Sequence, residues 1–239
     1  MISEIIEIME IMERRAAMRS KFDEQLLELN KEMIEMGNKI VQSIKNAIEA
    51  LIARDEKMAR AIMEGDVEID HLQKKIEGIC FNLLIQQQPV ARDLRNVTAA
   101  MKMVTDMERI GDHAADISEM TILMGQSSQI DKFEHISKMA AETMIMLNHS
   151  IEAYVEKDVI KAKEVIEHDD VVDDLFVEAK KDVIKLILNN PGEGEEATDI
   201  LMIAKYFERI GDHATNIAEW VIFSLKQKED AALNDSNTK

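Results

Sequence analysis

Apolar and polar residues follow each other along this chain with the period of an α-helix. From Phe22 to Leu51 an apolar side chain recurs every three or four residues, which predicts one long helix with a narrow buried stripe. A similar stripe over 1–17 loses its register at residues 19–21. The segment 1–17 is therefore expected to be an added helical extension.

The same period, together with end signals, predicts the remaining helices. Asp55 is a candidate N-cap for a short helix that ends near Gly65, and a further helix begins at Asp66. That helix ends at Pro89, because proline cannot continue a helix. The helices predicted beyond residue 54 cover 55–65, 66–88, 90–124, 131–157, 158–167, 169–189 and 196–228.

The chain repeats itself. The heptapeptide ERIGDHA stands at 108–114 and again at 208–214, each time in the last long helix of one half. Short connections between long helices favour antiparallel neighbours, so the predicted fold is all-α, with two tandem, pseudo-twofold-related three-helix bundles. The predicted domains are the extension 1–17, a first bundle over 18–125, a second bundle over 131–228 and a flexible polar tail over 229–239.

Each copy of the heptapeptide holds a glycine, Gly111 or Gly211, inside an apolar stripe that continues across it. The helix is therefore expected to continue through the glycine, at a cost of about 1 kcal/mol relative to alanine. A close approach by a neighbouring helix would explain why no side chain stands there.

Composition and charge limit the possible functions. The formal net charge of −18 disfavours nucleic acid as a partner and suits cations or basic patches on proteins. Cys80 is the single cysteine, so it is expected to be a buried thiol in a reducing compartment. No signal peptide and no apolar run of about 20 residues is present, so no transmembrane segment is expected. These features predict a soluble, cytoplasmic protein.

Carboxylates recur four residues apart, which puts them about 6 Å apart along one side of a helix. In the first half these are Asp66, Asp70, Glu108, Asp112 and Asp116, and in the second half Asp169, Asp173, Glu208 and Asp212. One interpretation makes Asp66 and Asp169 helix N-caps and Asp70 and Asp173 first-turn acids that complement the helix dipole. The other makes each set a metal site.

The metal interpretation rests on the cost of facing carboxylates. Four of them across two helices must be protonated or neutralised by bound cations, and oxygen ligands select iron, zinc, manganese or magnesium. All nine acids are therefore candidate metal ligands. His113 and His213 follow the motif aspartates directly and are expected to bond to a neighbouring helix or to a carboxylate of the site.

At these motifs the chain resembles the PhoU family, phosphate-signalling regulators associated with the Pst phosphate transporter. The resemblance covers about 18–228, and its clearest motifs are QPVARDLR at 88–95, ERIGDHAADI at 108–117 and ERIGDHATNIAE at 208–219. It implies two three-helix bundles and multinuclear iron or zinc clusters on the paired E(D)xxxD motifs. Asn216 stands where the first half has Asp116, so the two sites are expected to differ in charge or metal number.

The resemblance also implies a regulatory role without catalysis. The partners would be the transporter's ATPase subunit and a membrane sensor histidine kinase, with the protein reaching the inner face of the membrane only through them. The acidic face of the segment 1–17 favours a protein partner there, either a second copy of the chain or the transporter. Two enzyme classes fit less well: a di-iron oxidase needs Glu-x-x-His, and a metal-dependent phosphohydrolase needs more histidines than are clustered here. A helical scaffold whose acidic rows bind a basic partner without metal stays open.

Overall fold

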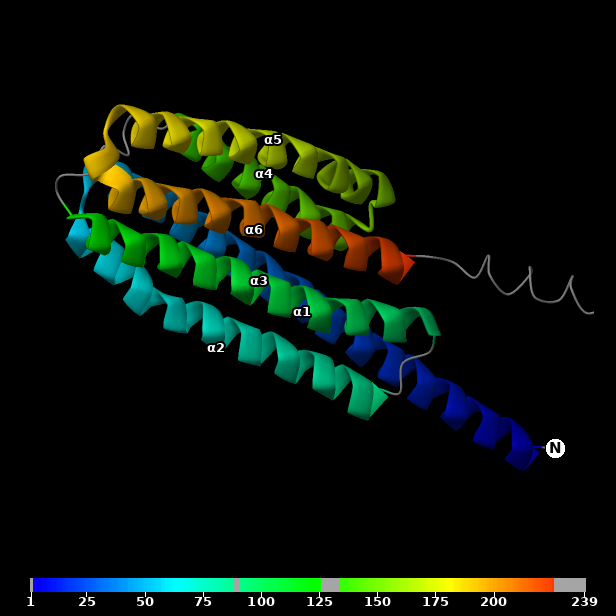
Figure 1. Ribbon diagram of the computed structural model, residues 1–239. Helices are drawn as coiled ribbons and strands as arrows, with labels where there is room; N and C mark the ends of the chain where they lie inside the picture. The colour runs from blue at the N-terminus through cyan, green and yellow to red at the C-terminus, as the bar shows by residue number, and fades with distance from the viewer. Residues whose placement is uncertain (1, 88–90, 126–133, 226–239) are drawn as a thin grey trace, which may run out of the picture.

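Six long helices form most of the protein in the computed structural model, which describes residues 2–87, 91–125 and 134–225 (Figure 1). They are α1 (Ile2–Ala53), α2 (Glu56–Gln87), α3 (Ala91–Met124), α4 (Glu134–Glu156), α5 (Val159–Asn189) and α6 (Gly194–Leu225), with the short 3-10 helix η3 (Pro191–Glu193) before α6. The described residues contain no strand. The predicted all-α fold of two three-helix bundles is confirmed, whereas the predicted tail 229–239 lies outside the described residues.

The connection between the first and second helices is built in the same way in both bundles. Arg54 and Lys157 both take left-handed backbone angles, with φ of 57° and 59°, and each is followed by an aspartate. Asp55 accepts a hydrogen bond of 3.0 Å from the amide of Met58, and Asp158 caps the first turn of α5. The prediction of Asp55 as an N-cap is therefore confirmed. The two halves share this turn although most of the residues around it differ.

Two predicted helix breaks are wrong. α2 continues through Gly65 and Asp66, and α5 continues through Asp169. Adding a residue to an existing helix forms a hydrogen bond for each residue ordered, whereas starting a new helix does not. The propensity cost of Gly65, about 1 kcal/mol, is therefore insufficient to end α2. Because Asp66 and Asp169 lie inside helices, their interpretation as N-caps is also wrong.

α1 runs without a break from Ile2 past the register change at residues 19–21. Its first turns extend beyond the ends of α2 and α3 (Figure 1). Where α1 reaches the bundle, Arg19 donates a hydrogen bond of 2.7 Å to Asp93 of α3. The separation of 1–17 from the first bundle stays a prediction, since the helix itself marks no boundary there.

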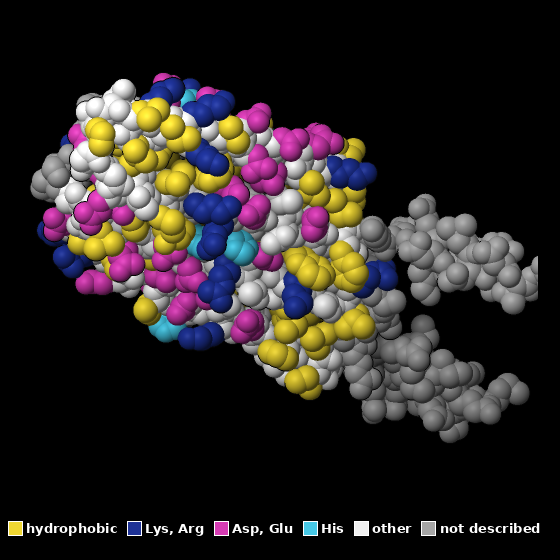
Figure 2. Space-filling model, in the orientation of Figure 1, with side chains coloured by type: hydrophobic (Ala, Val, Ile, Leu, Met, Phe, Trp, Pro, Cys, Tyr) yellow, Lys and Arg dark blue, Asp and Glu magenta, His cyan; other side chains and the backbone are white. Residues whose placement is uncertain are grey.

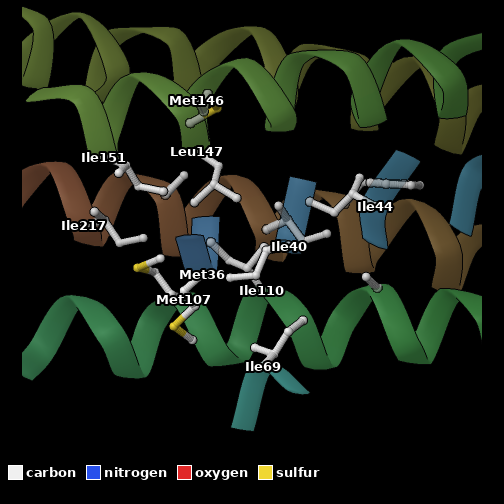
Figure 3. Packing of buried hydrophobic residues seen from close by; sticks show 14 of the residues in the cluster. Met36, Ile40, Ile44, Ile69, Met107, Ile110, Met146, Leu147, Ile151 and Ile217 are labelled. Carbon is white, nitrogen blue, oxygen red and sulfur yellow. The ribbon is translucent and has the colours of Figure 1, made fainter. Parts of the chain in front are cut away.

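One hydrophobic core joins the two bundles. Side chains of α1, α3, α4 and α6 meet in the same space (Figure 3), because α1 packs against α4 as well as against α2 and α3, and α3 packs along α6. The labelled residues at this junction are Met36, Ile40, Met107, Ile110, Leu147, Ile151 and Ile217. Cys80 is also fully buried, and burial raises the pKa of its thiol to about 12.

At each motif glycine, side chains of a neighbouring helix lie close to the helix that carries the glycine. A Cβ atom at Gly111 would stand 3.0 Å from Ile69 Cδ1 and 3.4 Å from Asp66 Oδ1 of α2. A Cβ atom at Gly211 would stand 3.0 Å from Asp169 Oδ1 of α5. The expected close approach is confirmed, and in both bundles it brings an aspartate beside the ERIGDHA motif.

Alanine substitutions should separate helix propensity from close packing. Gly78→Ala, at a helical glycine whose Cβ would meet nothing within 4 Å, should raise the free energy of unfolding by about 0.5–1 kcal/mol. Gly111→Ala should give no gain or a loss of about 1 kcal/mol, because Ile69 must move. Urea denaturation of both variants measures the difference, and an equal gain at the two positions would contradict the packing argument.

Candidate metal centres

Two carboxylate clusters occupy equivalent places in the two bundles. The first cluster lies between α2 and α3 and the second between α5 and α6. The first comprises Asp66, Asp70, Glu108, Asp112 and Asp116, and the second Asp169, Asp173, Glu208 and Asp212. All nine candidate ligands predicted from the sequence therefore fall into these two places.

The carboxylates of the two clusters differ in how far the neighbouring helices bury them. The side chains of Glu108 and Glu208 are 16% and 15% exposed, whereas Asp116 is 39% exposed. Asp173 is also exposed at the rim of its cluster. Asp212 is exposed as well. The two glutamates are thus largely buried, whereas Asp116, Asp173 and Asp212 reach solvent.

Proton affinities in the first cluster show that its charges interact. Burial and the charge of Asp112, followed by the other carboxylates of the cluster, raise the pKa of Asp66 to about 6. Burial and the charge of Asp112 likewise raise the pKa of Glu108. Asp66 is therefore partly protonated near neutral pH when no cation is present.

The second cluster repeats this behaviour. Burial and the charges of Asp173 and Asp212 raise the pKa of Asp169 to about 6. Burial and the charge of Glu208 raise the pKa of both Asp173 and Asp212. Burial and neighbouring charges therefore raise carboxylate pKa values in both bundles, although the residues around the two clusters differ.

Each cluster has one basic side chain from its own helix. Arg109 donates a hydrogen bond of 2.8 Å to Asp112, and Lys205 forms an ion pair with Glu208. Glu108 Oε2 is buried and has no hydrogen-bond partner among the described residues, since Arg109 Nε lies 3.5 Å away. A buried carboxylate oxygen without a partner is costly, so the first cluster is incompletely neutralised.

The two motif histidines bind carboxylates through Nδ1. His213 Nδ1 lies 2.8 Å from Asp106 Oδ1, which joins α6 to α3, whereas His113 Nδ1 lies 3.2 Å from Asp116 Oδ2 on its own helix. This is the predicted bonding, to a neighbouring helix in one half and to a cluster carboxylate in the other. Their imidazole rings are 5.7 Å apart between centroids.

Sequence reasoning missed Asp106. This residue accepts from both His213 and Asn216, whose Nδ2 lies 3.2 Å away. The repeat carries no signal for it, because the corresponding position of the second half is Tyr206. Only the packing of α3 along α6 brings Asp106 to the second motif.

The donor chemistry of both clusters fits a hard or borderline cation. The carboxylates are numerous, partly desolvated and mutually repulsive, and one oxygen lacks a partner. Within the described ranges no three carboxylate, imidazole or thiol groups already surround one point as ligands. Holding an ion would therefore require side-chain rotation and, at Asp112 and Glu208, displacement of the basic partner.

Comparison with known proteins identifies the family of this chain. The model of the PhoU domain family matches residues 33–121 and 136–221. The chain belongs to the PhoU family. The family resemblance of the motifs is thus confirmed, and one matched segment lies within each bundle. No helix among the described residues is long and apolar enough to cross a membrane.

Relatives within the family extend over most of this PhoU chain. A phosphate-specific transport system accessory protein PhoU homolog of Clostridium acetobutylicum is 37% identical over 91% of this chain and 99% of its own. The Aquifex aeolicus protein of the same name is 33% identical over 79% of this chain and 86% of its own.

Solved PhoU structures share the fold. The crystal structure of PhoU from Pseudomonas aeruginosa has a TM-score of 0.79 at 28% identity and covers 85% of this chain and 98% of that one. The phosphate transport system regulatory protein PhoU from Streptococcus pneumoniae has a TM-score of 0.78 at 28% identity, covering 85% and 96%.

Removing one charge from a cluster should stabilise the metal-free protein. Asp66→Asn in the presence of chelator should raise the free energy of unfolding at pH 7 by about 1 kcal/mol, after allowance for solvent screening. Because the folded state raises the pKa of Asp66 to about 6, the contribution of Asp66 to wild-type stability falls as pH rises from about 4 to 6. The gain should therefore be complete above pH 6 and absent below pH 4.

Thermal unfolding of the Asp66→Asn variant across this pH range tests the prediction. Glu64→Gln removes a charge from an exposed residue of the same helix and serves as the control. A loss of stability at pH 7 in the Asp66→Asn variant would show that its carboxylate is not repelled by the cluster.

Proposed function

We propose that this protein is a metal-binding regulator of phosphate uptake and phosphate signalling that acts by binding the ATPase subunit of the Pst transporter. A membrane sensor histidine kinase is a second partner in this proposal. Family membership and the names of the relatives support the link to phosphate transport. The protein would work in the cytoplasm and reach the membrane through these partners.

The repeated pair of carboxylate clusters carries the metal part of the proposal. Asp66, Asp70, Glu108 and Asp112 would hold cations in the first bundle, with Asp116 at the rim. Asp169, Asp173, Glu208 and Asp212 would do so in the second bundle. Oxygen ligands of this kind suit iron or zinc, and also manganese or magnesium. Bound cations supply the positive charge that the clusters lack.

The chain's own residues explain how cations would support partner binding. Without them, burial and the charges of neighbouring carboxylates raise the pKa values of Asp66 and Asp169, so part of the shift is repulsion across the α2–α3 and α5–α6 crossings. Neutralisation would hold each helix pair together and present a fixed surface. A surface that is already ordered loses less entropy on binding, so the affinity for a partner rises.

A scaffold without metal is the second candidate, and one observation favours it. Arg109 and Lys205 already pair with Asp112 and Glu208, so basic groups can occupy the clusters. A basic partner segment could do the same through charge-assisted hydrogen bonds. Neither candidate requires catalysis, and we propose none.

Metal analysis separates these candidates. Protein purified without chelator should carry more than one iron, zinc or manganese ion per chain, because facing carboxylates are relieved by cations. The double variant Glu108→Ala/Asp112→Ala should lose the ions of the first cluster and keep those of the second. Elemental analysis of folded protein measures both.

The control for the metal analysis is Glu119→Ala, which removes an exposed acid from the same helix. Its metal content should equal that of the wild type. Wild-type protein without bound metal would favour the scaffold, and unchanged content in the double variant would remove Glu108 and Asp112 from the site.

Partner binding should depend on the cations. The affinity for the purified ATPase subunit should fall by about tenfold or more after chelation, since the helix pairs must then be ordered on binding. Titration calorimetry with and without chelator measures this change. The same protein is also screened for phosphoester hydrolysis. The protein would be an enzyme if it did not bind the ATPase subunit and showed metal-dependent hydrolysis that the Asp112→Asn and Asp212→Asn variants lost.

A further inference from the structure

A basic hollow lies between the two carboxylate clusters, where α3 of the first bundle meets α6 of the second. It has a volume of about 620 Å³, and its lining includes Arg109, Arg209, His113, His213, Asp212 and Thr215. Figure 2 shows basic and histidine side chains gathered at the centre of this face, over α3 and α6, with acidic areas on either side. On a chain with a net charge of −18, the hollow brings together two arginines beside one lining carboxylate, Asp212.

Two hydrogen-bond donors in the hollow are unused. Arg209 is exposed and makes no ion pair or hydrogen bond with any other residue that the structure describes. Thr215 Oγ1 is buried and lacks a partner within the same described part of the chain. A guanidinium with an unused fork and an unsatisfied hydroxyl are groups that an oxyanion would satisfy.

The remaining polar groups of the hollow are already engaged. His213 and Asn216 are bound to Asp106, and His113 is bound to Asp116. Arg109 reaches the hollow while bonded to Asp112 of the first cluster. Asp212 of the second cluster also lines the hollow, and its negative charge opposes an anion there.

We propose that this hollow binds a tetrahedral oxyanion of the phosphate class, held by Arg109 and Arg209, and by the hydroxyl of Thr215 once its side chain rotates toward the hollow. The planar guanidinium fork matches two oxygens of such an anion. The ligand is either free inorganic phosphate or the phosphoryl group of a small molecule. Extended nucleic acid is disfavoured because the acidic clusters flank the hollow on both sides.

The hollow is coupled to the clusters through Asp112 and Asp212. This part of the inference rests on the proposed metal centres. A cation held by Asp112 displaces Arg109 and leaves its guanidinium free to bind the anion, and a cation held by Asp212 neutralises the carboxylate that lines the hollow. Metal therefore strengthens oxyanion binding, and by thermodynamic reciprocity the oxyanion strengthens metal binding.

Titration calorimetry with inorganic phosphate tests the inference on full-length protein whose metal content has been measured. Arg209→Gln should weaken phosphate binding at least tenfold, because it removes the unengaged guanidinium of the hollow. Arg209→Lys should be intermediate, since it keeps the charge and loses the fork. Arg60→Gln, which removes an equal charge at an exposed site on α2, should bind as the wild type does.

The outcomes separate the two proposals. Metal-loaded protein that does not bind phosphate, or binds it equally well in the Arg209→Gln variant, would overturn the hollow while the metal centres stand. Protein that carries no metal would overturn the metal centres, and phosphate binding that Arg209→Gln abolishes would still support the hollow. A parallel titration with glycerol phosphate identifies the source, because binding of both ligands points to a phosphoryl group and binding of phosphate alone points to the free ion.

Discussion

The close approach of an acidic helix to a glycine is the constraint on which this structure depends. Gly111 and Gly211 let Asp66 and Asp169 come within about a side-chain's width of the neighbouring helix, where they face other carboxylates. Ordinary helix packing avoids like charges at such a crossing. The fold accepts the repulsion twice, in both bundles, and the proposed cations would relieve it.

The two halves share the order of their three helices, but they differ in the length of the first helix and in the side chains at the junction between the bundles. Asp106 binds His213 and Asn216 across the junction, whereas His113 binds Asp116 within its own helix. The junction is therefore polar on its surface and apolar beneath, where the cores of the two bundles merge. Both helices of the junction, α3 and α6, also carry one of the carboxylate clusters.

Arg109 occupies the position at which these features meet. It belongs to the repeated motif, neutralises Asp112 and reaches the hollow between the bundles. Its counterpart Arg209 makes no such pair with the described residues, and Lys205 neutralises the second cluster in its place. The arginine of the repeated motif thus pairs with a carboxylate in the first half and with none of the described residues in the second. The proposed oxyanion site is therefore asymmetric.

The sequence by itself determined the helices, their division into two repeats and the nine acids of the clusters, because each depends on local periodicity or on a repeated motif. It misplaced the helix starts at Asp66 and Asp169, since tertiary packing supports a continuous helix through residues that would cap an isolated one. Only the tertiary structure decided that the two cores merge, that Asp106 reaches His213 and that Arg109 and Arg209 share one hollow. These contacts join residues about a hundred positions apart in different halves, and no period of the sequence records which faces of α3 and α6 meet.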